Sequence, residues 1–145
     1  MPHFRSPVAH AHKGAVAPRN DVDAHYAAVC AVLWSERELL ESLACTVIVE
    51  QLMTHAGAAR RAADDVQHDA MRRLGLQEVL RAAIVEALLT AISAPATTTL
   101  RELALTAPEP WGTMLREHHD SLAALSSDLQ SLSGFEQLSL HDFLT

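Results

Sequence analysis

The side chains best suited to metal chemistry in this sequence are its nine histidines and two cysteines. Di-metal sites in helical bundles need Glu from two helices and a Glu-x-x-His motif from two others, so that carboxylates and imidazoles meet in the core. Only Asp65-x-x-His68 approaches that motif, and it occurs once. The adjacent His118 and His119 would point about 100° apart on a helix, so they cannot share an ion. The sequence therefore predicts no metal site and no cofactor.

Covalent catalysis has no better support in the sequence. Cys30 and Cys45 lie within apolar helical patterns, where small thiols are common core residues. On one helix they would be about 22 Å apart, which is too far for a disulfide. The charged stretch "EREL" at 36–39 has the pattern of an exposed helical face, and no phosphate loop or dinucleotide fingerprint is present. We expect a protein that is not an enzyme.

Composition and charge limit the kinds of molecule that this protein is expected to bind. Hydrophobic residues make up 49% of the chain and aromatic residues 4%, with five Gly and six Pro, which is typical of helical proteins. The net charge is −7, and residues 1–20 hold three basic and no acidic residues, which leaves −7 − 3 = −10 for residues 21–145. Such acidity disfavours nucleic acids and anionic membranes as partners.

Targeting signals are also absent from the sequence pattern. No run approaches 18 apolar residues, so we expect no membrane insertion. Residues 1–20 contain no continuous apolar stretch of the kind found in a secretory signal. A cytoplasmic location is the expectation that follows.

The spacing of apolar residues predicts two long helices in the first two thirds of the chain. The first would begin at a cap formed by Asn20 or Asp21 and end at a turn on Gly57. The second would follow directly and end at Pro95. Gly75 lies inside the second helix, but the apolar register continues across it without a slip. We therefore expect one long helix there, bent at most at Gly75.

A third long helix is expected near the C-terminal end. Thr97 or Thr98 can cap a short helical piece, and the third helix then runs over residues 111–134. The predicted fold is all-α, an elongated antiparallel bundle of three long helices with a short connecting helix and flexible termini. It has three parts: a disordered N-terminal tail (residues 1–20), a helical bundle (21–134) and a C-terminal apolar segment (135–145).

The third predicted helix carries an apolar stripe at steps of four and three residues. Its members are Trp111, Leu115, His118, Leu122, Leu125, Leu129 and Leu132. A stripe of this size needs a covering partner. It can pack on the first two helices as core, and its C-terminal part can, with residues 135–144, form a groove for another protein's helix. On this stripe we expect His118 to be neutral and hydrogen-bonded; a pH-sensing role is the alternative.

Three stretches of the chain resemble one known family. They are "LWSERELLESL" at 33–43, "EQLMTHAG" at 50–57 and "LRELALTAPEPWGTMLREHHDSLAAL" at 100–125. These stretches are similar to motifs of the FlgN-type flagellar export chaperones, in an actinobacterial-like form. The closing "SLHDFL" also looks like tails in that group, and the resemblance covers about residues 25–145.

The resemblance implies a cytosolic chaperone of the flagellar type III export system. Such proteins hold hook-filament junction proteins (FlgK- and FlgL-like) through an amphipathic C-terminal segment and escort them to the export gate. By the resemblance, the client-binding region contains Leu122, Leu125, Leu129 and Leu132. On apolarity alone we add Phe135, Leu138, Phe143 and Leu144. The alternative is a self-associating structural bundle, a homodimer without a flagellar client.

Overall fold

The computed structural model describes residues 19–52, 57–133 and 140–145, and every regular element among these residues is an α-helix. The prediction of an all-α chain with packed long helices is thereby confirmed. There are five helices in these ranges: α1 (Arg19–Leu52), α2 (Gly57–Ala91), α3 (Leu100–Thr106), α4 (Trp111–Ser133) and α5 (Leu140–Leu144). Most of the predicted tail, residues 1–18, lies outside the described residues.

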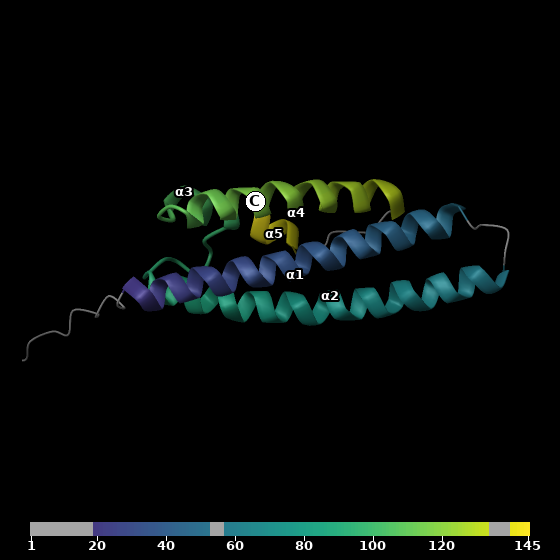
Figure 1. The fold of residues 1–145 in the computed structure, drawn as a ribbon, viewed down its shortest axis with the longest axis horizontal. Coiled ribbons are helices and arrows are strands. Elements are labelled where there is room, and N and C mark those ends of the chain that lie inside the picture. Colours follow the sequence, from purple (N-terminus) through teal and green to yellow (C-terminus); the bar gives the residue numbers. More distant parts are fainter. Residues whose placement is uncertain (1–18, 53–56, 134–139) are drawn as a thin grey trace, which may run out of the picture.

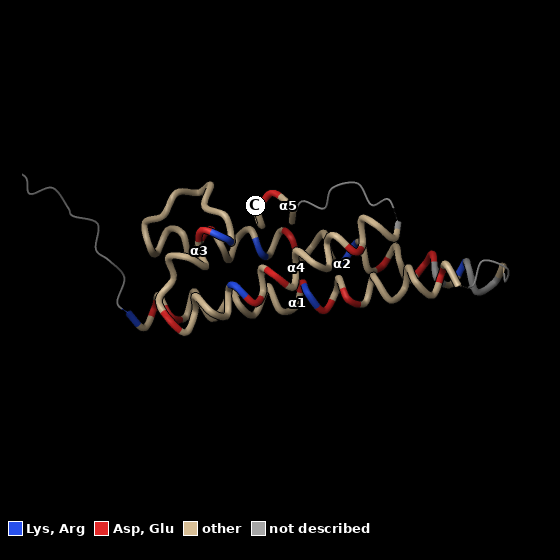
Figure 2. Tube along the Cα trace, turned by 90° about the horizontal axis from the view of Figure 1, so that it is seen from above, with Lys and Arg blue, Asp and Glu red and all other residues tan. Residues whose placement is uncertain are grey.

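Helix α1 lies between the other two long helices (Figure 1). Helix α2 runs back along one side of α1, whereas α4 packs on the other side and starts at the same end as α1. The short helices α3 and α5 both pack against α4. Seen from above, α5 lies to one side of the long helices (Figure 2). Because α1 is covered on both sides, it forms the centre of the core.

The packing of α4 on α1 follows a seven-residue repeat. A step of seven returns to nearly the same face of a helix after two turns. In α4 this face is built by three leucines that are fully buried: Leu115, Leu122 and Leu129. They belong to the same core cluster as the buried residues Val29, Leu33, Leu40 and Leu43 of α1. We call this contact the α1–α4 seam.

Polar and aromatic contacts fix both ends of the α1–α4 pair. At one end the ring of Trp111 stacks on Tyr26 at a centroid distance of 6.0 Å, and its Nε1 donates to Asp23 Oδ1 at 2.9 Å. At the other end Gln51 donates from Nε2 to the backbone oxygen of Leu132. These contacts lie at matching ends of the two helices, which sets the register of α4 along α1.

Two helix boundaries between α2 and α4 differ from the predicted ones. Helix α2 ends at Ala91, and Ser93 then adopts a left-handed conformation with φ of 56°. The cap of α3 is Thr99, which accepts from the backbone N–H of Glu102 while the Glu102 carboxylate accepts from the Thr99 N–H. This reciprocal capping box satisfies two backbone donors, so the prediction of Thr97 or Thr98 as the cap is wrong.

The ends of α1 and the middle of α2 also refine the predicted helices. Asn20 and Asp21 lie inside α1, so neither caps it, and α1 ends at Leu52. Gly57 is the first residue of α2 and does not close α1. Helix α2 continues without interruption through Gly75, as the unbroken apolar register indicates.

None of the described helices is both long enough and apolar enough to pass through a membrane.

Candidate functional site

The eight residues predicted to bind a client do not share one exposed surface. Leu122, Leu129 and Leu144 are buried, whereas Leu125 and Phe143 are half-buried and pack against the core. Leu132 is half-buried near the end of α4, and Phe135 and Leu138 lie outside the described residues. The three buried leucines contribute to the core, so among the described residues of this set only Leu125, Leu132 and Phe143 are partly accessible.

The C-terminal helix α5 docks on the chain's own helices. Leu140 and Leu144 are 1% and 3% exposed, which places two of its five side chains in the core. His119 on α4 donates from Nε2 to the backbone oxygen of Leu144 at 3.1 Å. The apolar end of the chain therefore has a partner within the chain, which the sequence left open.

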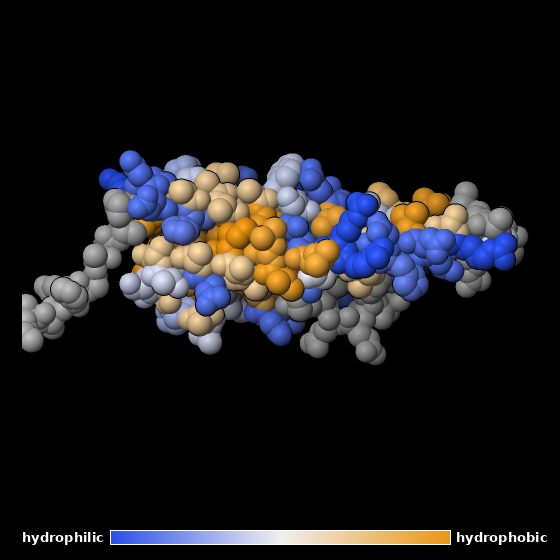
Figure 3. All heavy atoms as spheres, turned by 90° about the horizontal axis from the view of Figure 1, so that it is seen from below, coloured by the Kyte–Doolittle hydropathy of each residue, from blue (hydrophilic) through white to orange (hydrophobic). Residues whose placement is uncertain are grey.

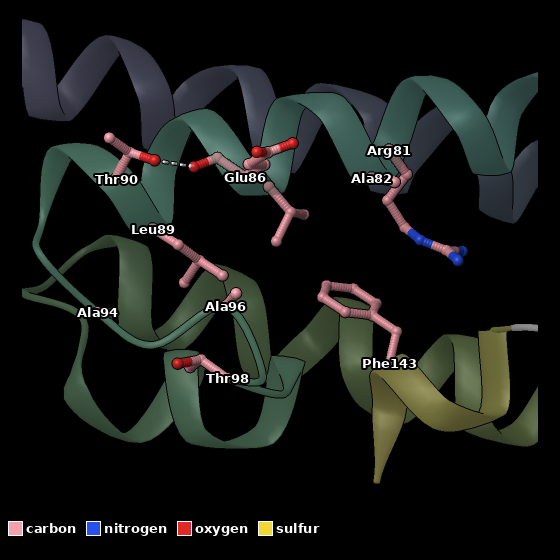
Figure 4. Close-up of a pocket in the computed structure, with 10 residues that line it drawn as sticks. Arg81, Ala82, Glu86, Leu89, Thr90, Ala94, Ala96, Thr98 and Phe143 are labelled. Atoms are coloured by element: carbon pink, nitrogen blue, oxygen red, sulfur yellow. Dashed lines mark hydrogen bonds between the residues drawn. The ribbon is translucent and has the colours of Figure 1, made fainter.

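A groove separates α5 from α2. It has a volume of about 420 Å³ and is open to solvent on one side. Its lining comes from α2, from the connection before α3 and from α5: Arg81, Ala82, Val85, Glu86, Leu89, Thr90, Ala94, Ala96, Thr98 and Phe143. The side chains of Leu89 and Phe143 extend into the space between the elements (Figure 4). We call this hollow the α2–α5 groove, and it is large enough for two or three apolar side chains.

A buried cation closes one end of the α2–α5 groove. Arg81 is 6% exposed, donates from Nη1 to the carboxylate of Glu36 on α1, and places its guanidinium 5.1 Å from the centroid of the Phe143 ring. Arg81 therefore joins three helices, α1, α2 and α5. Because a guanidinium has five N–H donors, Arg81 can offer further hydrogen bonds to an acceptor placed in the groove.

The carboxylate of Glu36 is more deeply buried than the cation. Glu36 is 0% exposed, and among the described residues its Oε2 has no hydrogen-bond partner. Burial raises the pKa of Glu36, and the Arg81 guanidinium opposes that rise. Removing either member of such a pair leaves a charge or a polar group without compensation in the core. Substitution of Glu36 on α1 should therefore disturb Arg81 at the end of the groove.

The sequence pattern contained one signal for this buried pair. Glu36 interrupts an otherwise apolar row of α1, and a polar residue at a core position indicates a buried partner. The prediction that "EREL" forms an exposed charged face is wrong for Glu36, although Glu38 is exposed. No local pattern identifies Arg81 as the partner, because the two residues are 45 positions apart.

His118 lies in the α1–α4 seam and differs from its prediction in one respect. It is 7% exposed, and its Nδ1 is buried without a hydrogen-bond partner among the described residues. Its ring meets Trp34 edge-on at a centroid distance of 6.2 Å. Burial lowers the pKa of His118, and the nearby Arg37 lowers it further while Glu117 opposes the change. Burial therefore favours the neutral imidazole, whereas the predicted hydrogen bond is not made at Nδ1 among the described residues.

The described residues contain no cluster of three or more His, Cys, Asp or Glu side chains arranged for a metal ion. Asp65 and His68 are both exposed on α2, and the His68 ring contacts the backbone oxygen of Asp64. Cys30 is buried and Cys45 is exposed, so the two thiols lie in different environments of α1.

Comparisons of the chain with family models, with curated proteins and with solved structures find no match.

Proposed function

We propose that this chain is a cytosolic, FlgN-type chaperone of the flagellar type III export system. It holds the amphipathic C-terminal helix of a hook-filament junction protein (FlgK- or FlgL-like), prevents its premature assembly and delivers it to the export gate. The proposal rests on the resemblance of the three sequence stretches to that family. The observation that supports it is the α2–α5 groove, which has apolar walls, a size suited to a few side chains, and Phe143 of the closing segment at its edge.

The groove suits an amphipathic helix better than a small rigid ligand. Val85, Leu89 and Phe143 supply an apolar wall, and helices bind such grooves through apolar residues spaced three and four apart. Arg81 at the closed end would donate hydrogen bonds to the carbonyl oxygens at a helix C-terminus, which carry a partial negative charge. We infer that the client inserts its C-terminal turn between α2 and α5.

The proposed architecture is that of the family: an elongated bundle of three long helices, in which α2 runs antiparallel to α1 and α4 (Figure 1) and α3 is the connecting helix. In this arrangement α1 supports both α2 and α4, and the groove forms where α5 returns beside α2. The partner surface then lies at the C-terminal region of the chain. It centres on Phe143 and the facing residues of α2. Leu122 and Leu129 contribute to binding only indirectly, as core residues that support this surface.

The experiment is size-exclusion chromatography with light scattering, on the chain alone and co-expressed with the FlgK-like protein encoded in the same genome. We expect a stable one-to-one complex. The substitution Ala82→Trp fills the groove from an exposed position and should abolish that complex. Its matched control, Ala124→Trp on the exposed face of α4, should leave it intact.

Both variants should keep the helix content of the wild type, measured by circular dichroism, because both positions are exposed. Absence of any complex with the junction protein would overturn the proposed function. If the complex instead forms with Ala82→Trp but not with Ala124→Trp, the client binds outside the groove.

A further inference from the structure

The outer face of α2 is apolar and exposed. Leu76, Val79 and Leu80 are 70%, 71% and 50% exposed, and Ala83 and Ala87 continue the same face. Steps of four, three and four from 76 to 87 keep these residues on one side of a helix. Apolar side chains gather on the side of the molecule where α2 lies, with hydrophilic side chains toward both ends (Figure 3). We call this set the α2 outer face.

No described helix covers the α2 outer face. Helix α2 packs on α1 through its opposite side, where Leu74, Val85 and Leu88 are buried. Each large apolar side chain left in water forgoes about 1.5–3 kcal/mol of burial free energy. Because three such residues are grouped on about one and a half turns of helix, binding of a partner that covers this surface would be favourable.

Two opposite charges beside this face lie at equal distances from its centre. Arg72 lies seven residues before Val79 and Glu86 lies seven residues after it, so all three share one flank of the helix. All three are exposed. Arg72 donates to Asp69 within its own helix at 2.9 Å, which leaves other guanidinium donors for a second carboxylate.

We propose that the α2 outer face is an interface between two copies of this chain, formed by an antiparallel α2–α2 pair. A twofold axis at Val79 places Val79 of one copy against Val79 of the other, with Leu76 and Leu80 of each copy beside the axis. The same axis places Arg72 opposite Glu86 of the second copy, again twice. A parallel pair would instead set Arg72 against Arg72 and Glu86 against Glu86, and like charges facing each other are unfavourable.

The symmetry favours a second copy of the chain over an unrelated partner. A client helix needs apolar contact and charge complementarity, but it does not need opposite charges at equal distances from the centre of the α2 outer face. Self-complementarity of this kind is the property that a twofold interface requires. The inference goes beyond the proposed function and does not depend on it, because Leu76, Val79 and Leu80 do not line the groove. Glu86 borders both surfaces.

The first test measures mass by light scattering as the protein concentration rises from micromolar to submillimolar. We expect the wild-type mass to move from one copy toward two. Val79→Glu should remain at one copy throughout, because it places two carboxylates at the axis. Leu105→Glu on α3, a position 71% exposed, is the matched control and should follow the wild type. A wild-type chain that stays at one copy, or a Val79→Glu variant that still pairs, overturns the proposal.

The second test exchanges the charges. Arg72→Glu and Glu86→Arg should each weaken the dimer by roughly tenfold, because each sets like charges opposite one another at two places. Mixing the two variants should restore pairing, since the mixed dimer again places Arg opposite Glu at both places. A mixture that pairs no better than the separate variants overturns the antiparallel register. Because Arg72 is not part of the groove lining, Arg72→Glu should still bind a client, so this test is separate from that of the proposed function.

Discussion

Helices α4 and α2 both carry apolar stripes at helical spacing, but only one stripe is covered within the chain. On α4, Leu115, Leu122 and Leu129 are fully buried against α1. On α2, Leu76 and Val79 are more than two-thirds exposed. The spacing of apolar residues thus indicates that a face needs a partner, but it does not indicate whether that partner belongs to the same chain.

The difference arises because α2 has two apolar faces and α1 covers one of them. Its inner face packs on α1 and also carries the buried Arg81, whereas its outer face carries the exposed Arg72. Helix α4 has only one strongly apolar stripe, and α1 covers it. Paired substitutions on covered and uncovered faces can therefore test this distinction.

The largest difference in unfolding free energy is expected between two arginines of α2, Arg81 on its inner face and Arg72 on its outer face. Arg81→Ala leaves the Glu36 carboxylate buried without its cation, which should lower the free energy of unfolding by about 3–5 kcal/mol. Arg72→Ala removes an exposed side chain and should change it by less than about 0.5 kcal/mol. Urea unfolding at low protein concentration, where the α2 outer face is uncovered, measures both.

A double variant separates the charge from the packing of Arg81. Replacing both members by apolar residues, Glu36→Leu with Arg81→Met, should recover most of the stability lost in Arg81→Ala, since no buried charge remains. If Arg81→Ala and Arg72→Ala were equally mild, the ion pair would not be buried in solution.

The second largest difference is expected between two leucines of the compared stripes. Leu122→Ala creates a cavity in the α1–α4 seam and should cost about 2–5 kcal/mol of unfolding free energy. Leu76→Ala on the α2 outer face should cost less than about 0.5 kcal/mol in the monomer. Thermal unfolding, monitored by circular dichroism, measures the loss of stability in each variant. Equal losses would mean that the outer face is covered within the chain.

Much of the fold could be predicted because the long helices follow local apolar patterns. The register through Gly75 predicted a single helix α2, and the pattern from Trp111 predicted the helix that the structure describes over Trp111–Ser133. The caps were less predictable, because Thr97, Thr98 and Thr99 are chemically equivalent in the sequence. Only Thr99 stands three residues before Glu102, and that spacing is the signal of a capping box.

The candidate site was less predictable than the fold. The apolarity of Phe143 predicts that it binds a partner, and it lines the groove. Arg81 and Glu36, by contrast, become neighbours only when α1 packs on α2. Leu122 and Leu129 have the same apolar character as Leu76 and Leu80, and only the tertiary arrangement separates core from surface. Local patterns therefore predict faces, whereas the pairing of faces depends on long-range packing.

A smaller difference of opposite sign is expected between two glycines. A Cβ at Gly112 would lie 3.0 Å from the backbone oxygen of Ala107 and 3.2 Å from that of Ala104, where α4 begins against the end of α3. Gly112→Ala should therefore destabilise the chain by about 1–3 kcal/mol. A Cβ at Gly75 meets nothing within 4 Å, so Gly75→Ala should stabilise it by up to about 1 kcal/mol. Chemical unfolding of both variants measures these changes in unfolding free energy. A stabilising effect of Gly112→Ala would contradict the close approach of α3 and α4.

The smallest expected effect is a pH dependence of stability that arises from His118 in the covered α1–α4 seam. The pKa of His118 is lowered by burial and by Arg37 on α1, with Glu117 on its own helix opposing. In the unfolded chain the imidazole takes up a proton near its ordinary pKa of about 6.5, whereas the folded chain does so only at lower pH. The unfolded state therefore binds more protons as the pH falls below about 6.5, and the free energy of unfolding decreases until the folded pKa is passed.

His118→Leu should remove this contribution and flatten the loss of stability between about pH 7.5 and 5.5 relative to the wild type. Glu36 has the opposite sign, because its pKa is raised by burial, but it is present in both proteins and cancels in their difference. Urea unfolding at several pH values measures that difference. An unchanged slope in His118→Leu would mean that His118 reaches water in solution, so that the α1–α4 seam would be open at its centre like the outer face of α2.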